Sequence, residues 1–137
     1  MTSKTLYTAH VHTIGGRDGA ARSSDGHLDI QLATPGTKRP GTNPEQLFAA
    51  GWSACFEGAL ARAASQAGIG LPNGTAVDAE VDLNLDDAEG FHLIARLTVS
   101  LPGLDPQMAQ FLVSSADAIC PYSKMTRGGI SAHVALA

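Results

Sequence analysis

This chain of 137 residues contains two cysteines, and a cysteine thiolate is both a nucleophile and a redox centre. Cys55 lies in an apolar stretch beside Trp52 and Phe56, where a free cysteine is often buried and inert. Cys120 precedes Pro-Tyr-Ser at the junction of two expected helices, where free backbone amides could favour a thiolate. A cysteine at a helix end can equally be a core residue. Residue type alone therefore leaves both roles open for each cysteine.

The spacing of the cysteines excludes two common motifs. They are 65 positions apart, which fits neither a C-x-x-C redox motif nor paired zinc ligands. A metal site would need His10 and His12, which alternate onto one strand face, together with a cysteine. His-x-His on a strand is more often two solvated side chains. We therefore expect no metal and no cofactor.

The composition predicts one globular domain spanning residues 1–137, with 44% hydrophobic and 16% charged residues. The net charge is −4, and the nine Lys and Arg residues are scattered, so we expect no nucleic-acid partner. The N-terminus lacks the apolar core of a signal peptide, and no apolar run approaches the ~20 residues of a membrane span. We therefore expect a cytoplasmic protein without membrane contact. Structural disulfides are rare in that compartment, so the cysteines should be catalytic, redox-sensing or simply buried.

The elements that must position the cysteines follow from periodicity and capping. Period-two alternation and turn signals predict an N-terminal meander of strands over residues 7–14, 21–23 and 27–32. Asn43, Pro44 and Glu45 open a helix that should run to about residue 67, with Gly68 as its left-handed cap.

The helix that carries Cys55 is apolar on nearly every face, so we expect it to be central and covered all round. One small chain has limited means of covering it, which predicts a homodimer. Strands are expected over residues 77–85, 91–101 and 130–136, with a second long helix over residues 106–119. This order of elements predicts an α+β fold with antiparallel sheets.

Arg17 and Glu45 are candidates for supporting Cys55. Glu45 lies ten positions before Cys55, on a similar helix face but about 15 Å away along the axis. Arg17 lies in a glycine-rich turn, and its guanidinium could pair with Glu45 while its charge reaches the thiolate. Without further information, Arg17 is expected to be a solvated turn residue, and Glu45 is expected to interact only with the dipole of its helix.

An apolar substrate pocket is predicted near the two cysteines. Aromatic side chains lie within a few helical turns of one cysteine or the other in sequence. They are Phe48, Trp52, Phe56, Phe111 and Tyr122.

Five segments spread over the whole chain carry a family resemblance. They are Gly-Gly-Arg-Asp-Gly (15–19), Ser-Ser-Asp-Gly (23–26), Gly-Thr-Asn-Pro-Glu-Gln-Leu-Phe-Ala-Ala-Gly-Trp-Ser-Ala-Cys-Phe (41–56), Leu-Pro-Gly-Leu (101–104) and Cys-Pro-Tyr-Ser-Lys-Met-Thr-Arg-Gly (120–128). Together they resemble the organic hydroperoxide resistance branch of the OsmC/Ohr family. The arginine of the first turn and the tyrosine after Cys-Pro favour this branch over the osmotically induced OsmC branch. Trp52 stands where a tyrosine is expected, a difference that does not touch the chemistry.

The resemblance implies an intertwined homodimer, with antiparallel sheets around a long central helix and two active sites at the subunit interface. It also implies a role for each matched residue. Cys55 would be the peroxidatic cysteine and Cys120 the resolving cysteine that forms a disulfide with it. Arg17 would hold the thiolate and polarise the peroxide, and Glu45 would orient Arg17.

The implied activity is the reduction of organic hydroperoxides to alcohols. Attack by the thiolate leaves a sulfenic acid, which condenses with the second thiol, and an external dithiol reopens the disulfide. The resemblance points to a lipoylated protein, or another dithiol, as that reductant. Two other roles stay open: a dimeric module that binds a lipid-like ligand, with structural cysteines, and a redox sensor whose disulfide switches a partner interaction.

Overall fold

The computed structural model describes residues 3–137, which form two antiparallel sheets and three α-helices. The predicted α+β class with antiparallel sheets is therefore confirmed. The chain divides into two compact units, one up to Leu47 and one from Phe48 onward, and each is described by itself.

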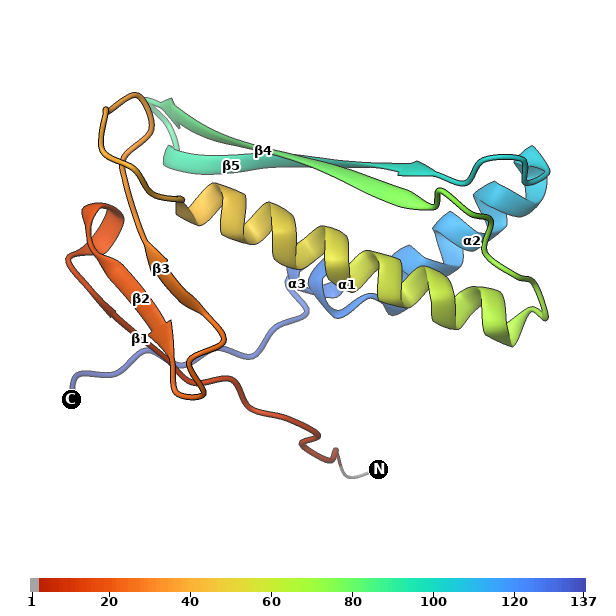
Figure 1. The fold of residues 1–137 in the computed structure, drawn as a ribbon, viewed down its shortest axis with the longest axis horizontal. Coiled ribbons are helices and arrows are strands. Elements are labelled where there is room, and N and C mark those ends of the chain that lie inside the picture. The colour runs from red at the N-terminus through yellow and green to blue at the C-terminus, as the bar shows by residue number, and fades with distance from the viewer. Residues whose placement is uncertain (1–2) are drawn as a thin grey trace. The chain divides into compact units, whose positions relative to one another are not determined.

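The first unit is built on a three-stranded meander in the order β1 (Val11–Ile14), β2 (Ala20–Ser23) and β3 (Asp29–Gln31) (Figure 1). The three strands occur where the sequence predicts them, but the outer two are shorter than predicted. Strand β2 offers four residues for pairing, so β1 pairs over four residues and β3 over three.

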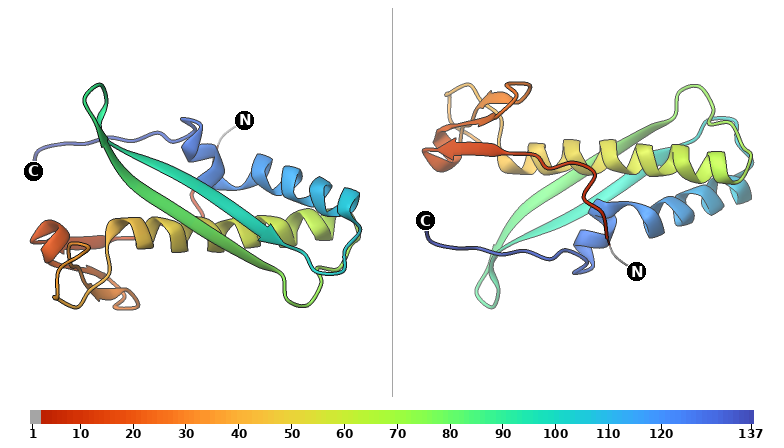
Figure 2. Two further views of the ribbon diagram at one scale, coloured as in Figure 1. Left: turned by 90° about the horizontal axis from the view of Figure 1, so that it is seen from above. Right: turned by 90° about the horizontal axis from the view of Figure 1, so that it is seen from below.

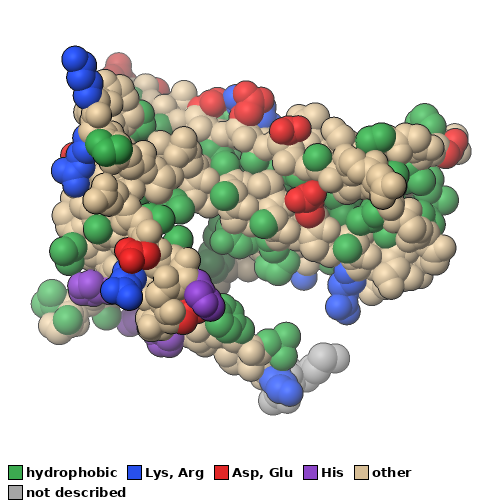
Figure 3. Space-filling model, viewed as in Figure 1, with side chains coloured by type: hydrophobic (Ala, Val, Ile, Leu, Met, Phe, Trp, Pro, Cys, Tyr) green, Lys and Arg blue, Asp and Glu red, His purple; other side chains and the backbone are tan. Residues whose placement is uncertain are grey.

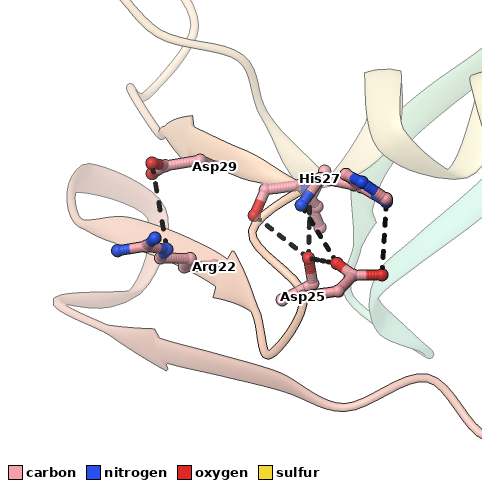
Figure 4. A network of polar contacts seen from close by, with 6 residues as sticks. Arg22, Asp25, His27 and Asp29 are labelled. Atoms are coloured by element: carbon pink, nitrogen blue, oxygen red, sulfur yellow. Dashed lines mark hydrogen bonds and ion pairs between the residues drawn. The ribbon is translucent and has the colours of Figure 1, made fainter.

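The turn from β2 to β3 is closed by side chains, as Figure 4 shows. The Asp25 carboxylate accepts a hydrogen bond from the Ser23 hydroxyl at 2.6 Å and one from the His27 amide at 3.0 Å. These two donors hold the pKa of Asp25 below its usual range. Arg22 and Asp29 face each other across the strands at 4.0 Å. The Ser-Ser-Asp-Gly segment thus has a structural role in this turn.

The long helix α1 (Pro44–Gln66) begins and ends as predicted. The Asn43 side-chain oxygen accepts the Gln46 amide at 2.9 Å, which satisfies one free donor of the first turn. Gly68 has φ 69°, the left-handed conformation that glycine adopts at little cost. Among the described residues, neither α1 nor any other helix combines the length and apolarity needed to cross a membrane.

The second unit packs a hairpin against helices. Strands β4 (Ala76–Asp86) and β5 (Gly90–Ser100) pair along their whole length and lie over α1 and α2 (Pro106–Ile119) (Figures 1 and 2). A short helix, α3 (Pro121–Thr126), follows α2 directly. The buried core joins α1 to α2 and Cys120, and comprises Trp52, Phe56, Ala59, Leu60, Ala63, Ala64, Leu112, Ala116 and Cys120.

The hairpin presents polar side chains on the face that points away from this core. Arg96 donates to Asp82 at 2.8 and 3.0 Å and to Glu80 at 3.3 Å. In Figure 3, acidic side chains gather around a basic one along the upper edge, where the hairpin lies. Val77 and Leu97, from the alternate positions, pack against the core.

Two expectations about covered surfaces differ from the structure. The strand predicted over residues 130–136 is wrong for the single chain, because none of residues 3–137 pairs with this segment as a neighbouring strand. Val134 and Leu136 are accordingly 95% and 99% exposed. Helix α1 is also not covered all round: its residues Ala50, Ala54, Gly58 and Ala61 are exposed. An apolar face of α1 is therefore left open by this chain.

Candidate active site

The two cysteines meet in the second unit. The Sγ atoms of Cys55, in the middle of α1, and Cys120, at the junction of α2 and α3, lie 3.5 Å apart, and both are free thiols. Cys55 is partly exposed, whereas Cys120 is 0% exposed. Of the two cysteines in contact, Cys55 is therefore the one with exposed surface.

Burial is the main influence on the Cys55 thiol and raises its pKa above the ordinary cysteine value. The backbone at Tyr122 lowers the pKa, while the contact with Cys120 raises it further. The sequence predicted that the amides after Cys120 would act on Cys120 itself, whereas the backbone at Tyr122 influences the pKa of Cys55. The net effect on the Cys55 pKa is upward, opposite to the depression that is typical of reactive cysteines.

Arg17 and Glu45 meet in the first unit as a two-pronged ion pair. Arg17 Nη1 lies 3.0 Å from Glu45 Oε2, and Nη2 lies 2.7 Å from Oε1. The predicted fork between these residues is confirmed. The Glu45 side chain is 11% exposed and the Arg17 side chain 42%. The Arg17 hydrogen bonds hold the pKa of the Glu45 carboxyl below its usual range, so both groups are charged at neutral pH.

The loop that presents Arg17 depends on its glycines and on Asp18. Gly15 and Gly16 have φ 75° and 59°, and a Cβ on Gly19 would clash with the Ile14 carbonyl oxygen. Asp18 accepts the backbone N–H of Thr34 at 3.0 Å and its hydroxyl at 2.9 Å. Sequence reasoning missed Asp18, although an acid inside a glycine-rich turn is a signal for such a tie.

The structure brings four of the five predicted pocket residues together. The rings of Phe48 and Trp52 stack at 5.7 Å, and those of Phe48 and Tyr122 at 6.4 Å. Phe56 and Trp52 line a cavity beneath β5. Phe111 lines a separate hollow near the start of α2, so its place in a substrate pocket stays a prediction.

Residues with metal-binding side chains lie elsewhere. His10 and His12 are exposed and line a shallow hollow on the meander. Within residues 3–137, Asp86, Glu89 and His92 form the one group of three potential ligands. Asp86 Oδ1 accepts two amides of the β4–β5 turn at 2.9 and 2.7 Å, and His92 Nδ1 lies 3.4 Å from Asp86 Oδ2. Turn formation accounts for this group.

Comparison with known proteins shows full-length similarity to one family. Residues 34–134 match the family model described as OsmC-like protein. The organic hydroperoxide resistance protein of Xanthomonas axonopodis pv. citri (strain 306) is 45% identical over 138 residues, which cover 98% of this chain and 96% of that protein. The organic hydroperoxide resistance protein OhrB of Bacillus subtilis (strain 168) is 42% identical over 135 residues, which cover 96% of this chain and 98% of that protein.

Solved structures agree with the sequence comparison. The crystal structure of OhrB of Bacillus subtilis is similar with a TM-score of 0.84 at 43% identity, over 90% of this chain and 93% of that one. The crystal structure of an organic hydroperoxide resistance protein from Legionella pneumophila gives a TM-score of 0.85 at 40% identity, over 92% of this chain and 93% of that one.

Proposed function

Because this chain belongs to the organic hydroperoxide resistance branch of the OsmC/Ohr family, we propose that it reduces organic hydroperoxides to alcohols as a thiol-dependent peroxidase. The observation that carries the proposal is the pair of free thiols with sulfurs 3.5 Å apart, one partly exposed and one buried. Two thiols at this distance can be oxidised together to a disulfide, a change that removes two electrons from the pair.

The proposed reaction has two steps on the protein. The Cys55 thiolate attacks one peroxide oxygen, an S–O bond forms as the O–O bond breaks, and the leaving alkoxide takes a proton to become the alcohol. The Cys120 sulfur then attacks the Cys55 sulfenic sulfur. An S–S bond forms, the S–O bond breaks, and water leaves with the Cys120 proton. An external dithiol reopens the disulfide by exchange.

We assign Arg17 the task of stabilising the Cys55 thiolate and the developing alkoxide, and Glu45 the task of orienting Arg17. Two of the five N–H donors of Arg17 are used by Glu45, which leaves others for a substrate oxygen. Burial favours the neutral thiol of Cys55, so the thiolate that the proposed reaction requires calls for a cation, and the family resemblance assigns that cation to Arg17.

The reductant is proposed to be a lipoylated protein or another dithiol, as the family resemblance implies. A dithiol is available where thiols are kept reduced, so the proposal includes a cytoplasmic location.

A turnover assay tests the function and separates it from the two other roles. Purified protein is mixed with tert-butyl hydroperoxide, with dihydrolipoamide or reduced thioredoxin as donor, and peroxide loss is followed. A peroxidase turns over many times per site. A redox sensor consumes one equivalent and stops, and a lipid-binding module with structural cysteines loses no thiol to one equivalent of peroxide.

We predict a preference for organic hydroperoxides over hydrogen peroxide of about two powers of ten in kcat/KM. The rings of Phe48, Trp52 and Tyr122 lie on the elements that carry the two thiols. Burial of a four-carbon alkyl group contributes about 3 kcal/mol, roughly 0.8 kcal/mol for each methylene. Hydrogen peroxide has no such group and loses water contacts on entry. The measurement compares kcat/KM for cumene hydroperoxide and hydrogen peroxide under one saturating dithiol, and equal values would show these rings to be core only.

We also predict a homodimer in solution, formed by the whole chain 1–137 as one OsmC/Ohr-type domain. The family resemblance implies an intertwined dimer, and relatives align over 98% of the chain. The exposed apolar positions of residues 130–136 and the open face of α1 support it, since a second copy would cover both. Equilibrium sedimentation at micromolar concentration is expected to give twice the chain mass. A stable folded monomer would rule the dimer out.

A further inference from the structure

We propose that Ser123 and Trp52 are positioning residues for disulfide closure, the step in which Cys120 attacks the sulfur of Cys55. The proposal rests on the proposed function and adds to it a dedicated contact between α1 and α3 that controls the second step. Neither residue touches the reacting sulfurs through its own polar atoms.

The contact is a buried hydrogen bond in which the Trp52 indole N–H donates to the Ser123 hydroxyl oxygen at 3.1 Å. Ser123 is 0% exposed and Trp52 is 9% exposed. A buried indole N–H without an acceptor is costly, so this bond holds α3 in one place on α1.

Both ends of the bond are next to the chemistry. Trp52 lies three positions before Cys55, hence on a neighbouring part of the same helix face. Ser123 lies three positions after Cys120, and the Lys124 amide donates to the Cys120 carbonyl oxygen at 3.0 Å, which joins them in one helical turn. The bond therefore fixes the turn that carries Cys120 against the helix that carries Cys55.

Two further contacts of Tyr122, the residue before Ser123, depend on the same placement. The backbone at Tyr122 lies near enough to the Cys55 sulfur to lower the pKa of that thiol. A Cβ on Gly51 would lie 2.8 Å from the Tyr122 hydroxyl oxygen, so the ring packs directly on the backbone of α1. The Trp52–Ser123 hydrogen bond and the packing of the Tyr122 ring on Gly51 thus hold α3 against the face of α1 that carries Cys55.

Disulfide closure needs this accuracy. The sulfurs are 3.5 Å apart and must approach by about 1.5 Å to reach bonding distance. Cys120 belongs to the junction between two helices, so loosening α3 would let its sulfur drift away from the sulfenic acid. A misplacement of about 1 Å can cost as much as 100-fold in rate.

The test is Ser123→Ala, with the two oxidation steps timed separately. After mixing with tert-butyl hydroperoxide, samples are quenched, the Cys55 sulfenic acid is trapped with dimedone, and sulfenic acid and disulfide are counted by mass spectrometry. The first step should stay within about twofold of wild type, and disulfide closure should slow about tenfold. Ser53→Ala, which removes a hydroxyl bonded only to backbone carbonyls of α1, is the matched control and should change neither step.

The double variant Trp52→Phe/Ser123→Ala separates positioning from general destabilisation. It keeps an aromatic ring at position 52 and leaves no orphaned indole donor, so its melting temperature should recover relative to Ser123→Ala. Closure should remain about tenfold slow, because the anchor is still absent. If the double variant recovered both its melting temperature and its rate of disulfide closure, the proposal would be overturned. The proposal would also be overturned if Ser123→Ala slowed both oxidation steps equally, or slowed neither step.

A parallel arm uses oxidised glutathione, which loads Cys55 as a mixed disulfide that Cys120 resolves by releasing glutathione thiol. Slower closure of Ser123→Ala here supports the anchor even if hydroperoxide fails to oxidise wild-type Cys55. In that case the proposed function fails and the positioning role stands. Equal closure rates in this arm would overturn the positioning role whatever the peroxide result.

Discussion

Replacing Cys55 with serine is expected to abolish hydroperoxide consumption, whereas Cys120→Ser should still consume one equivalent per site. Cys55 is the partly exposed thiol, so its loss removes the sulfur that meets the peroxide. Cys120 is fully buried beside Cys55, so it is expected to act only after Cys55 has been oxidised. Without it, the Cys55 sulfenic acid has no neighbour to condense with and proceeds to sulfinic acid.

The measurement is single-turnover peroxide consumption, followed by mass spectrometry of residue 55. Both variants should keep the wild-type far-UV spectrum, since serine is close in size to cysteine. A normal burst from Cys55→Ser would reverse the two roles. Equal bursts from both variants would mean that either thiol can attack and that the difference in burial does not select between them.

Arg17→Ala is expected to lower the rate of Cys55 oxidation by about 10²- to 10³-fold at neutral pH and to move the pH–rate profile to higher pH. The sign follows from the charge. In the proposed role, the Arg17 guanidinium lowers the Cys55 pKa, so its removal would let the upward effect of burial dominate. The rate then rises only at more alkaline pH, where the thiolate forms without help. The fold should change little, because Arg17 is a turn residue with a 42% exposed side chain.

Control variants distinguish a local charge from a general one. Arg22→Ala removes a cation that is 70% exposed in the neighbouring strand, and it should leave the profile unchanged. Glu45→Gln keeps the shape of the carboxylate and should cause a smaller loss than Arg17→Ala. The wild-type ion pair is present at neutral pH and is lost only as pH falls through the lowered Glu45 pKa, so acid titration of this pair does not mimic the alkaline shift. An unchanged profile for Arg17→Ala would make Arg17 a bystander.

Much of the fold is predictable because its signals are local. Asn43 before Pro44 marks the start of α1, and Asp105 before Pro106 marks the start of α2, where its carboxylate accepts two amides at 3.1 and 3.2 Å. Gly68 marks the end of α1 for the same local reason. The period-two pattern likewise locates β4 and β5 to within one residue at each end.

The misses come from interactions over long distances. The alternation of residues 130–136 is that of a strand, but a strand needs a neighbour, and this chain supplies none among the residues described. The turn after Cys120 is found where the sequence indicates, yet the backbone at Tyr122 influences the pKa of Cys55, a residue far earlier in the chain. Ser123 carries no local signal at all, since its partner Trp52 lies 71 positions away.

The separation of the two cysteines along the chain means that oxidation to the disulfide should also raise the stability of the fold. A Cys55–Cys120 disulfide would close a loop of about 65 residues that contains the β4–β5 hairpin and α2. On the chain-entropy account, a loop of that size stabilises the folded form by roughly 4 kcal/mol, because it restricts the unfolded chain. The oxidised protein that accumulates when reductant is scarce would then be the form that unfolds least readily.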